Sequence, residues 1–221
     1  MRKTIKGIAA PLPLANVDTD VIMPKRFLRT ITREGLAAGT FADLRFYNDN
    51  SLRQDFVLNQ EPWKAANILV VGDNFGCGSS REHAVWGLRQ MGIEAIIGTS
   101  FAGIFFDNAR KNGLALPIIT SEKRDLLLKF SRNGKIFSVS VENKIVDIDG
   151  QEVHFMMDDA TQTALLEGRD DTLDSLKKSE AIDAFENSMS LKEKVSVITV
   201  SYTHLRAHET SLHLVCRLLL E

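Results

Sequence analysis

Cysteine is scarce in this sequence. Only Cys77 and Cys216 occur among 221 residues, and they form no Cys-x-x-Cys motif. Two thiols so far apart in the sequence argue against a fold held together by disulfides, and they fit a reducing cytoplasm. A cubane iron–sulfur cluster needs several thiolates, so this chain cannot hold one by itself.

Long apolar runs and an excess of one charge are also lacking. No run approaches the roughly 18 apolar residues that a membrane-spanning helix needs, and no apolar segment follows the charged N-terminus as it would in a signal peptide. The formal net charge is -2, so no global basic field attracts nucleic acid. We therefore expect a cytoplasmic protein that binds neither membrane nor nucleic acid.

What is present is the material of a globular α/β domain. The hydrophobic fraction is 44%, which is ordinary for a chain with a real core. Short apolar runs at 68–71, 95–97 and 116–119 alternate with amphipathic segments at 80–91 and 103–112, which end at Gly92 and Gly113. This order predicts βαβ units and a parallel sheet.

The next part of the chain changes character. Strands are expected at 136–141 and 145–148, with hairpin-type turns at Asn133–Gly134 and Asp149–Gly150. Helical segments are expected at 125–130, 160–166 and 179–189.

The last 31 residues, 191–221, differ from the rest. His204, His208 and Cys216 stand at a spacing that could suit a metal. However, the string SYTHLRAHET resembles a translated sequencing-adapter read-through that recurs at the ends of unrelated metagenomic proteins. We therefore expect one domain over 1–190 and a non-native tail over 191–221 without function.

Chemistry concentrates in the segment 72–84, GDNFGCGSSREHA, which leaves a buried strand and opens a helix. Ser79 and Glu82 match a capping box, which predicts Ser79 as the N-cap. Unpaired N–H groups at a helix start favour an anion, and the guanidinium of Arg81 can bind a carboxylate through two bonds. The segment predicts a small-anion site at the carboxyl edge of a parallel sheet.

Other interpretations of these residues remain open. Ser79 could be a cap only, Cys77 could be a reactive thiolate but more simply packs in a tight loop, and His83 could serve the fold alone. The segment is neither a P-loop nor a GxGxxG motif, so it does not indicate a nucleotide. Asp18 and Asp20 could ligate a divalent metal, although such turns more often bind backbone groups; we expect no metal here.

The segment NFGCGSSREHA resembles the signature of the aconitase-type swivelling domain, in the form found in isopropylmalate dehydratase small subunits. NVDTD at 16–20 and FAGIF at 101–105 match the same family in the same order, over roughly residues 1–190. The resemblance implies an α/β fold, a β/β/α swivelling domain with a parallel-sheet core and flanking helices. It also implies a hydro-lyase that is active only with a large subunit carrying a [4Fe–4S] cluster, acting on a small dicarboxylate.

The family match also assigns roles. Ser79 would be the catalytic base that removes a proton alpha to a carboxylate. The expected substrate-binding residues are Arg81, Ser80 and Gly78. The expected supporting residues are Glu82, His83, Asp18, Asp20, Asn74 and Cys77. The expected substrate-discriminating loop contains Phe27, Leu28, Arg29 and Thr30.

The residues of that loop do not settle the substrate, because apolar side chains suit an isopropyl group and arginine suits an extra carboxylate. The favoured activity interconverts 2-isopropylmalate and 3-isopropylmalate in leucine biosynthesis. A homoaconitase or methylmalate-type hydro-lyase is the alternative within the same class. A non-catalytic anion-binding module is the alternative outside it.

Overall fold

The computed structural model describes residues 4–28, 34–168, 175–176 and 178–189, and the expected tail at 191–221 lies outside these ranges. The chain divides into two compact units, Met1–Asp170 and Asp171–Glu221. The first unit contains the sheet and all the expected site residues. The described helix of the second unit is α8 (Ser179–Ser188), none of whose residues is buried.

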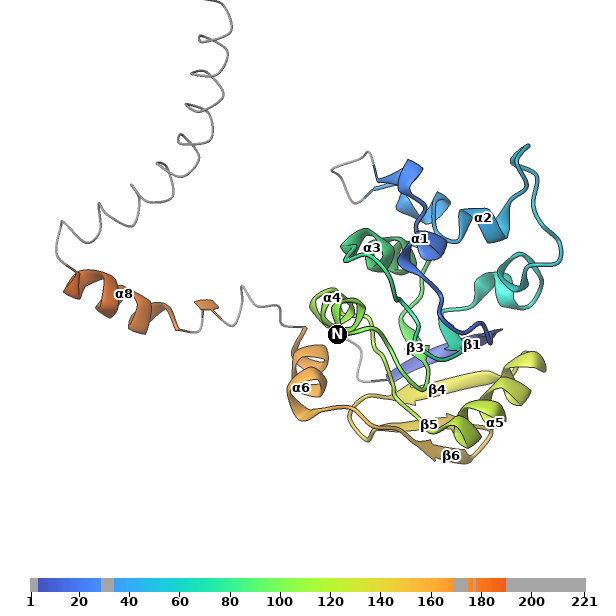
Figure 1. Ribbon diagram of the computed structural model, residues 1–221. Coiled ribbons are helices and arrows are strands. Elements are labelled where there is room, and N and C mark those ends of the chain that lie inside the picture. Colours follow the sequence, from blue (N-terminus) through green and yellow to red (C-terminus); the bar gives the residue numbers. More distant parts are fainter. Residues whose placement is uncertain (1–3, 29–33, 169–174, 177, 190–221) are drawn as a thin grey trace, which may run out of the picture. The chain divides into compact units, whose positions relative to one another are not determined.

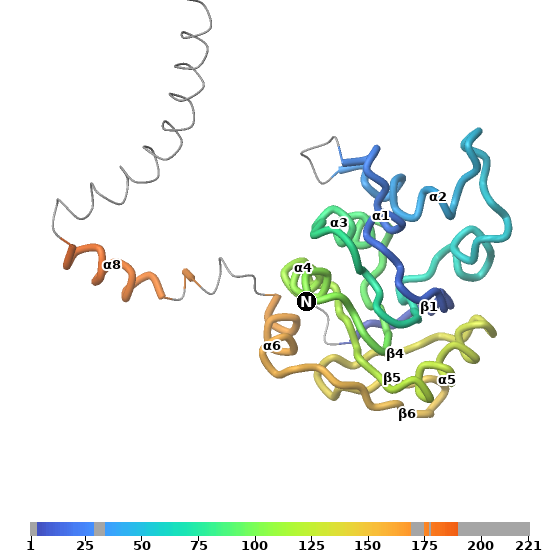
Figure 2. Tube along the Cα trace, in the orientation of Figure 1, coloured from blue at the N-terminus to red at the C-terminus, as the bar shows by residue number. Residues whose placement is uncertain are grey.

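A single sheet of six strands organises the first unit. The strands are β1 (Thr4–Leu12), β2 (Ile68–Val71), β3 (Ala95–Ile97), β4 (Ile136–Ser140), β5 (Ile145–Ile148) and β6 (Gln151–His154). Their order across the sheet is β3-β2-β1-β4-β5-β6. Strands β1, β2 and β3 are parallel, whereas β4, β5 and β6 form an antiparallel meander that joins the sheet at β1. Figure 2 shows the chain entering this meander after α5 (Ser121–Arg132).

The helices lie on both faces of the parallel strands (Figure 1). The longer ones besides α5 are α3 (Glu82–Gln90), α4 (Gly103–Lys111) and α6 (Asp159–Glu167). The short ones are α1 (Thr19–Ile22), α2 (Ala42–Arg45), η1 (Lys25–Phe27), η2 (Leu36–Ala38), η3 (Val57–Asn59) and η4 (Trp63–Ala65).

Two hydrophobic cores follow from the period of two along each strand. Leu69 and Val71 of β2 face the core shared with α1, α3 and α4. Ile68 and Val70 of the same strand face the core shared with α5 and the meander. All four side chains are fully buried, which is why β2 is a continuous apolar run and does not alternate with polar residues.

Most of the elements expected from the sequence are confirmed, including β2, α3, β3 and α4 in that order. Gly92 and Gly113 follow α3 and α4 with φ of 92° and 66°, as expected after a helix end. The expected strand at 116–119 does not form as a continuous strand: within this segment, Ile118 forms isolated bridges to Gly98 and Met156.

The hairpin-type turn expected at Asn133–Gly134 is also wrong. It is no hairpin but the end of α5, where Gly134 has φ of 64° and donates its N–H to the carbonyl of Ser131. The turn at Asp149–Gly150 does join two antiparallel strands, β5 and β6. Gly134 alone is left-handed in the first pair, whereas Asp149 and Gly150 both are in the second. The sequence of such a pair does not by itself distinguish a helix end from a hairpin.

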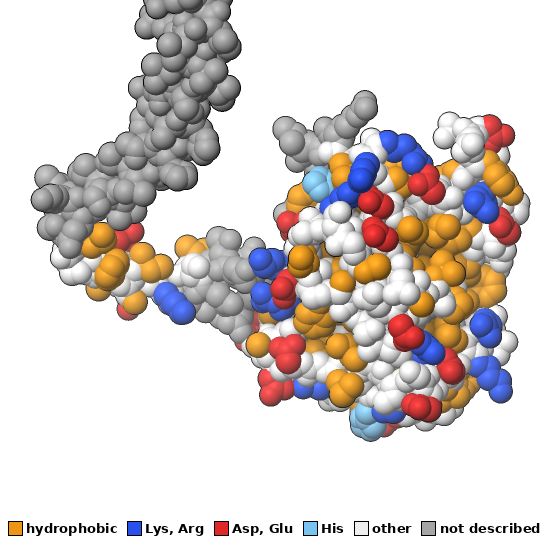
Figure 3. All heavy atoms as spheres, viewed as in Figure 1, with side chains coloured by type: hydrophobic (Ala, Val, Ile, Leu, Met, Phe, Trp, Pro, Cys, Tyr) orange, Lys and Arg blue, Asp and Glu red, His pale blue; other side chains and the backbone are white. Residues whose placement is uncertain are grey.

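Within the described ranges, no helix is long and apolar enough to cross a membrane. Acidic and basic side chains intermingle over the face drawn in Figure 3, without a large region of one sign.

Candidate active site

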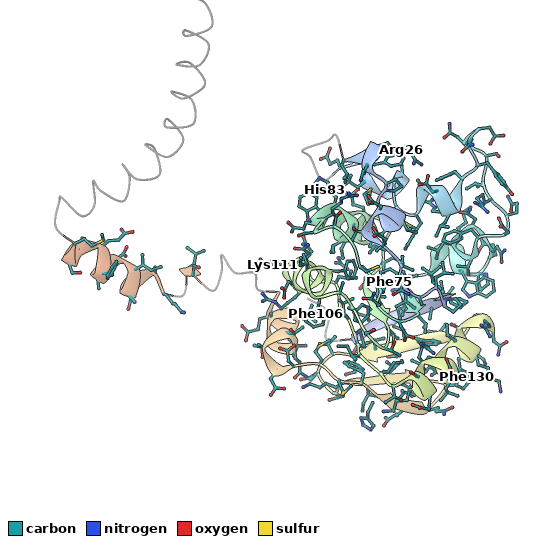
Figure 4. All side chains as sticks on the ribbon, in the orientation of Figure 1. Arg26, Phe75, His83, Phe106, Lys111 and Phe130 are labelled. Atoms are coloured by element: carbon teal, nitrogen blue, oxygen red, sulfur yellow. The ribbon has the colours of Figure 1, made fainter. Side chains whose placement is uncertain are left out.

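Three loops meet at the carboxyl edge of the parallel strands. They are the segment 13–18 after β1, the segment 72–81 after β2, and the segment 98–102 after β3. Phe75 of the second loop forms a parallel bridge with Phe101 of the third. Its ring is fully buried and meets the ring of Phe105 edge-on at 5.5 Å, and Figure 4 shows it deep in the molecule. This anchor fixes the loop that carries the expected anion site.

Backbone hydrogen bonds join the first two loops. Asn16 N–H donates to the carbonyl of Asp73 at 2.8 Å, and Gly76 N–H donates to the carbonyl of Val17 at 2.8 Å. Asn74 has φ of 53° and donates its side-chain amide to the Asn16 amide oxygen at 2.9 Å. The two segments that the sequence separates by about sixty residues therefore form one paired layer.

Gly78 allows the closest approach within this layer. Its φ is 88°, and a Cβ at this position would lie 2.1 Å from a carboxylate oxygen of Asp18. Asp18 in turn accepts the N–H of Asp20 at 2.6 Å and is the N-cap of α1. The Asp18 side chain therefore binds backbone and lies against Gly78, and its positioning role at the site stays a prediction.

Ser79, Arg81 and Asp20 form the polar centre of the site. Ser79 is exposed, and its Oγ lies 3.5 Å from Arg81 Nη2. The other terminal nitrogen of Arg81, Nη1, donates to Asp20 Oδ1 in an ion pair. The guanidinium side chain is only 13% exposed, so it is held in one orientation between the carboxylate and the hydroxyl.

The capping box expected at Ser79 is wrong. Helix α3 begins at Glu82, its N-cap is Arg81 with φ of -129° and ψ of 108°, and no side chain caps it. Ser79 stands two residues before the N-cap, in the loop. Its hydroxyl is therefore not occupied by the helix and stays available at the site.

The carboxylate of Glu82 has a different partner. Asn112, the residue after α4, donates its amide N–H to Glu82 Oε1 at 2.7 Å. The amide oxygen of Asn112 accepts the indole N–H of Trp86 at 2.9 Å. This network ties the start of α3 to the end of α4 and thereby supports the loop that ends at Arg81.

The remaining expected site residues have mixed positions. His83 packs against Trp86, with ring centroids 4.7 Å apart and ring planes tilted by 53°, and lies on the outer side of α3 (Figure 4). Cys77 is a half-buried free thiol, and Ser80 is exposed beside Ser79. His83 is thus packed on a neighbouring side chain of its own helix, and Cys77 is half-buried. Gly78 and Ser80 are exposed, as Ser79 is.

The expected discriminating loop is only partly described. Arg29 and Thr30 lie outside the described residues. Phe27 packs over Gly39, which the sulfur of Met23 also approaches. With Arg26, Phe27 lines a surface pocket bounded by Asp43, Phe46 and Tyr47. Leu28 packs against the core next to α1. Among the described residues, neither Phe27 nor Leu28 contacts Ser79.

Comparison with known proteins agrees with this architecture. Residues 2–123 match the aconitase C-terminal domain family. A 3-isopropylmalate dehydratase small subunit of Rhizobium rhizogenes is 49% identical over 194 residues, which cover 85% of this chain and 96% of that protein. The chain belongs to the 3-isopropylmalate dehydratase small-subunit family.

Two further relatives extend the comparison. The 3-isopropylmalate dehydratase small subunit of Roseobacter denitrificans is 45% identical over 188 residues, covering 84% of this family member and 94% of that protein. The crystal structure of 3-isopropylmalate dehydratase from Methanocaldococcus jannaschii matches with a TM-score of 0.60 and 29% identity, covering 83% of this chain and 99% of that one. The expected family and fold are therefore confirmed.

Sequence reasoning missed two residues of the site in this family member. Thr19 is 2% exposed and binds the Ser79 loop, whereas in the motif at 16–20 the sequence points to the two aspartates as the polar candidates. Asn112 is the last residue of the expected helix at 103–112 and the C-cap of the observed α4, and it carried no signal beyond a polar residue before Gly113. Thr19 and Asn112 both act through contacts between segments that are far apart in the sequence. A local sequence pattern cannot predict such contacts.

Proposed function

We propose that this chain is the small subunit of a 3-isopropylmalate dehydratase, a hydro-lyase of leucine biosynthesis. With a large subunit it interconverts 2-isopropylmalate and 3-isopropylmalate. Water leaves one carbon to give isopropylmaleate, and water then adds to the neighbouring carbon. The observation that carries the proposal at the level of the site is the exposed Ser79 hydroxyl beside a guanidinium held by Asp20.

In the proposed mechanism Ser79 accepts the proton alpha to a carboxylate. The base is the serine alkoxide, which forms when the hydroxyl loses its own proton to solvent and becomes the hydroxyl again when it takes the substrate proton. That alkoxide forms only when its negative charge is stabilised. Arg81 supplies a fixed positive charge, and the start of α3 adds its dipole in the same region. The Arg81 Nη2–Ser79 Oγ distance of 3.5 Å is at the limit for a hydrogen bond, but such contacts commonly tighten when substrate binds.

Arg81 has a second proposed task. Its Nη1 is occupied by Asp20, which leaves the Nη2 side towards Ser79 for a substrate carboxylate. A carboxylate bound there would lie next to the proton acceptor. Ser80 and Gly78 border the same place and are proposed to contribute backbone N–H donors, as anion-binding loops do.

The leaving hydroxyl requires a Lewis acid, which an iron of a [4Fe–4S] cluster on the large subunit would supply. The residues of this chain do not fit such a cluster. The sequence contains two cysteines, and among the described residues no three His, Cys, Asp or Glu side chains gather as ligands. We therefore assign the cluster to the partner, and a cytoplasmic location would keep Cys77 reduced.

Anaerobic reconstitution tests the proposal. The chain alone should be inactive, and activity on 2-isopropylmalate should appear when a cluster-loaded large subunit of this family is added. Ser79→Ala should lower kcat by at least about 10²-fold, as expected for loss of a positioned base, while KM changes little. Full activity of Ser79→Ala would remove the base assignment.

The same assay separates the alternatives. Faster turnover of homocitrate than of 2-isopropylmalate would indicate homoaconitase chemistry. Tight dicarboxylate binding by the isolated chain, unaffected by any large subunit, would indicate a non-catalytic module.

A further inference from the structure

Thr19 binds both carbonyls that flank the glycine of the site. It is the first residue of α1 and is 2% exposed. Its backbone N–H donates to the carbonyl of Cys77 at 2.8 Å. Its hydroxyl donates to the carbonyl of Ser79 at 2.9 Å, across sixty residues of sequence. The alternative acceptor, Asp18 Oδ1, is farther away at 3.5 Å, so the single hydroxyl proton serves the Ser79 carbonyl.

These two bonds set the direction of two peptide planes. In a trans peptide the N–H points opposite to the carbonyl of the same unit, and among the described residues the cis bond recorded is Glu61–Pro62. Because the Cys77 and Ser79 carbonyls point to Thr19, the N–H groups of Gly78 and Ser80 point away from it. Neither N–H donates to any atom of the described residues.

Both residues that bear these N–H groups are exposed. These two donors belong to the residues on either side of Ser79, whose Oγ lies 3.5 Å from Arg81 Nη2. The φ of 88° at Gly78 is the left-handed conformation that turns successive N–H groups to one side in anion-binding loops.

We infer that Thr19 is a positioning residue that aims the Gly78 and Ser80 N–H groups at a substrate carboxylate. It touches neither substrate nor the reacting proton, and the inference rests on the proposed function of Ser79 and its loop. Threonine suits this role because its β-branched side chain has a restricted χ1, which keeps the hydroxyl on the Ser79 carbonyl.

Two variants of Thr19 separate its hydroxyl from its shape. Thr19→Val keeps the branched shape and removes the donor, whereas Thr19→Ser keeps the donor and removes one methyl group. Each is reconstituted with the cluster-loaded large subunit next to wild type and Ser79→Ala. The measurements are kcat and KM for 2-isopropylmalate, and the melting temperature of each purified chain.

Thr19→Val should raise KM and lower kcat/KM by roughly 10- to 100-fold, the range expected when a binding group is misplaced by about an ångström. Thr19→Ser should remain within about 3-fold of wild type, because the hydrogen bond is kept. Ser79→Ala should show the opposite split, a low kcat with KM kept. A purely structural role would not produce a KM effect that serine rescues.

The outcomes distinguish this inference from the proposed function. Wild-type kinetics of Thr19→Val, or equal impairment of Thr19→Ser and Thr19→Val, overturns the role of the hydroxyl even when Ser79→Ala is inactive. A fully active Ser79→Ala overturns the base assignment, whatever Thr19 does. If Thr19→Val melts too low to be assayed, Thr19→Ala carries the same expectation, and a wild-type KM for it also overturns the inference.

Discussion

Asp20 and Arg81 are 61 residues apart and form an ion pair that joins α1 to the loop preceding α3. The arginine side chain is 13% exposed and the aspartate side chain 40%. A pair that is partly removed from water is screened less than a surface pair. The ion pair thus holds the guanidinium in place before substrate arrives, which spares part of the ordering cost at binding.

The first prediction concerns this pair. Asp20→Asn removes the negative charge and weakens the hold on Arg81, so kcat/KM for 2-isopropylmalate should fall about 10-fold, consistent with a lost charged hydrogen bond. Lys25→Ala is the matched control, since Lys25 Nζ lies 4.0 Å from the same carboxylate but its side chain is 76% exposed. Steady-state kinetics of both variants test this prediction. An equal fall in kcat/KM for Asp20→Asn and Lys25→Ala would contradict the claim that Asp20 acts by holding Arg81.

A second prediction uses two glycines with similar backbone and different surroundings. Gly78 and Gly92 have φ of 88° and 92°, but a Cβ at Gly78 would strike the Asp18 carboxylate, whereas one at Gly92 would meet nothing within 4 Å. Both alanine variants should lose about 1–2 kcal/mol of stability to the left-handed backbone. Only Gly78→Ala should also lose activity, because Asp18 and the loop must move apart. Thermal melts and kinetics of both variants test this prediction. An active Gly78→Ala would show that activity does not require the close approach of Asp18 to position 78.

How far the sequence predicted the site depends on the range of the interactions involved. The glycine-rich turn between β2 and α3 follows from residue types within one segment, and the small-anion site expected there stays a prediction. The Ser79 N-cap did not follow, because Thr19 binds the Ser79 carbonyl and the helix begins only at Glu82, with the extended Arg81 as its N-cap. A tertiary hydrogen bond thus overrides a local capping preference.

The same limit applies to the fold. The alternation of strands and helices through β3 and α4 is a local pattern and was predictable. The antiparallel attachment of β4 to β1 joins segments more than 120 residues apart, as in the pairing of Ile5 with Val139. The apolar run 116–119 contacts Gly98 and Met156 only through single bridges, and its composition alone could not distinguish this from a strand.

A third prediction concerns stability at low pH. Asp158 is the N-cap of α6 and accepts the N–H of Thr161 at 2.8 Å. Hydrogen bonds from Thr161 lower the pKa of Asp158 below its ordinary value of 3.8. A depressed folded-state pKa contributes stability that is complete above 3.8 and is lost as the pH falls through the lower folded value.

Asp158→Asn is the variant that tests this cap. It keeps an acceptor for the helix N–H and removes the titrating charge. The melting temperature of Asp158→Asn should differ most from that of wild type at neutral pH. The two melting temperatures should converge below about pH 4, where the Asp158 carboxyl becomes protonated. A difference that stays constant with pH would exclude the linkage.

A fourth prediction concerns the network behind the site. Asn112 donates to Glu82 Oε1 at 2.7 Å and to the carbonyl of Asn108 at 2.8 Å, while it accepts from Trp86. Asn112→Asp would replace the donor by a carboxylate facing Glu82. Loss of the bond and the new repulsion should cost about 2 kcal/mol at neutral pH, and kcat/KM should fall because the start of α3 supports Arg81.

The pH dependence gives this last variant a distinctive signature. Two facing carboxylates raise the pKa of the pair in the folded state. A raised folded-state pKa means that stability is lost as the pH rises through it, so Asn112→Asp should approach wild type below roughly pH 4–5 and diverge above that range. Trp86→Phe is the control, because it removes one hydrogen bond of the same amide without adding a charge, and its deficit should not vary with pH. Melting temperatures of the three proteins measured from pH 4 to 8 test the network; a deficit of Asn112→Asp that does not grow with pH would place Glu82 out of reach of that side chain.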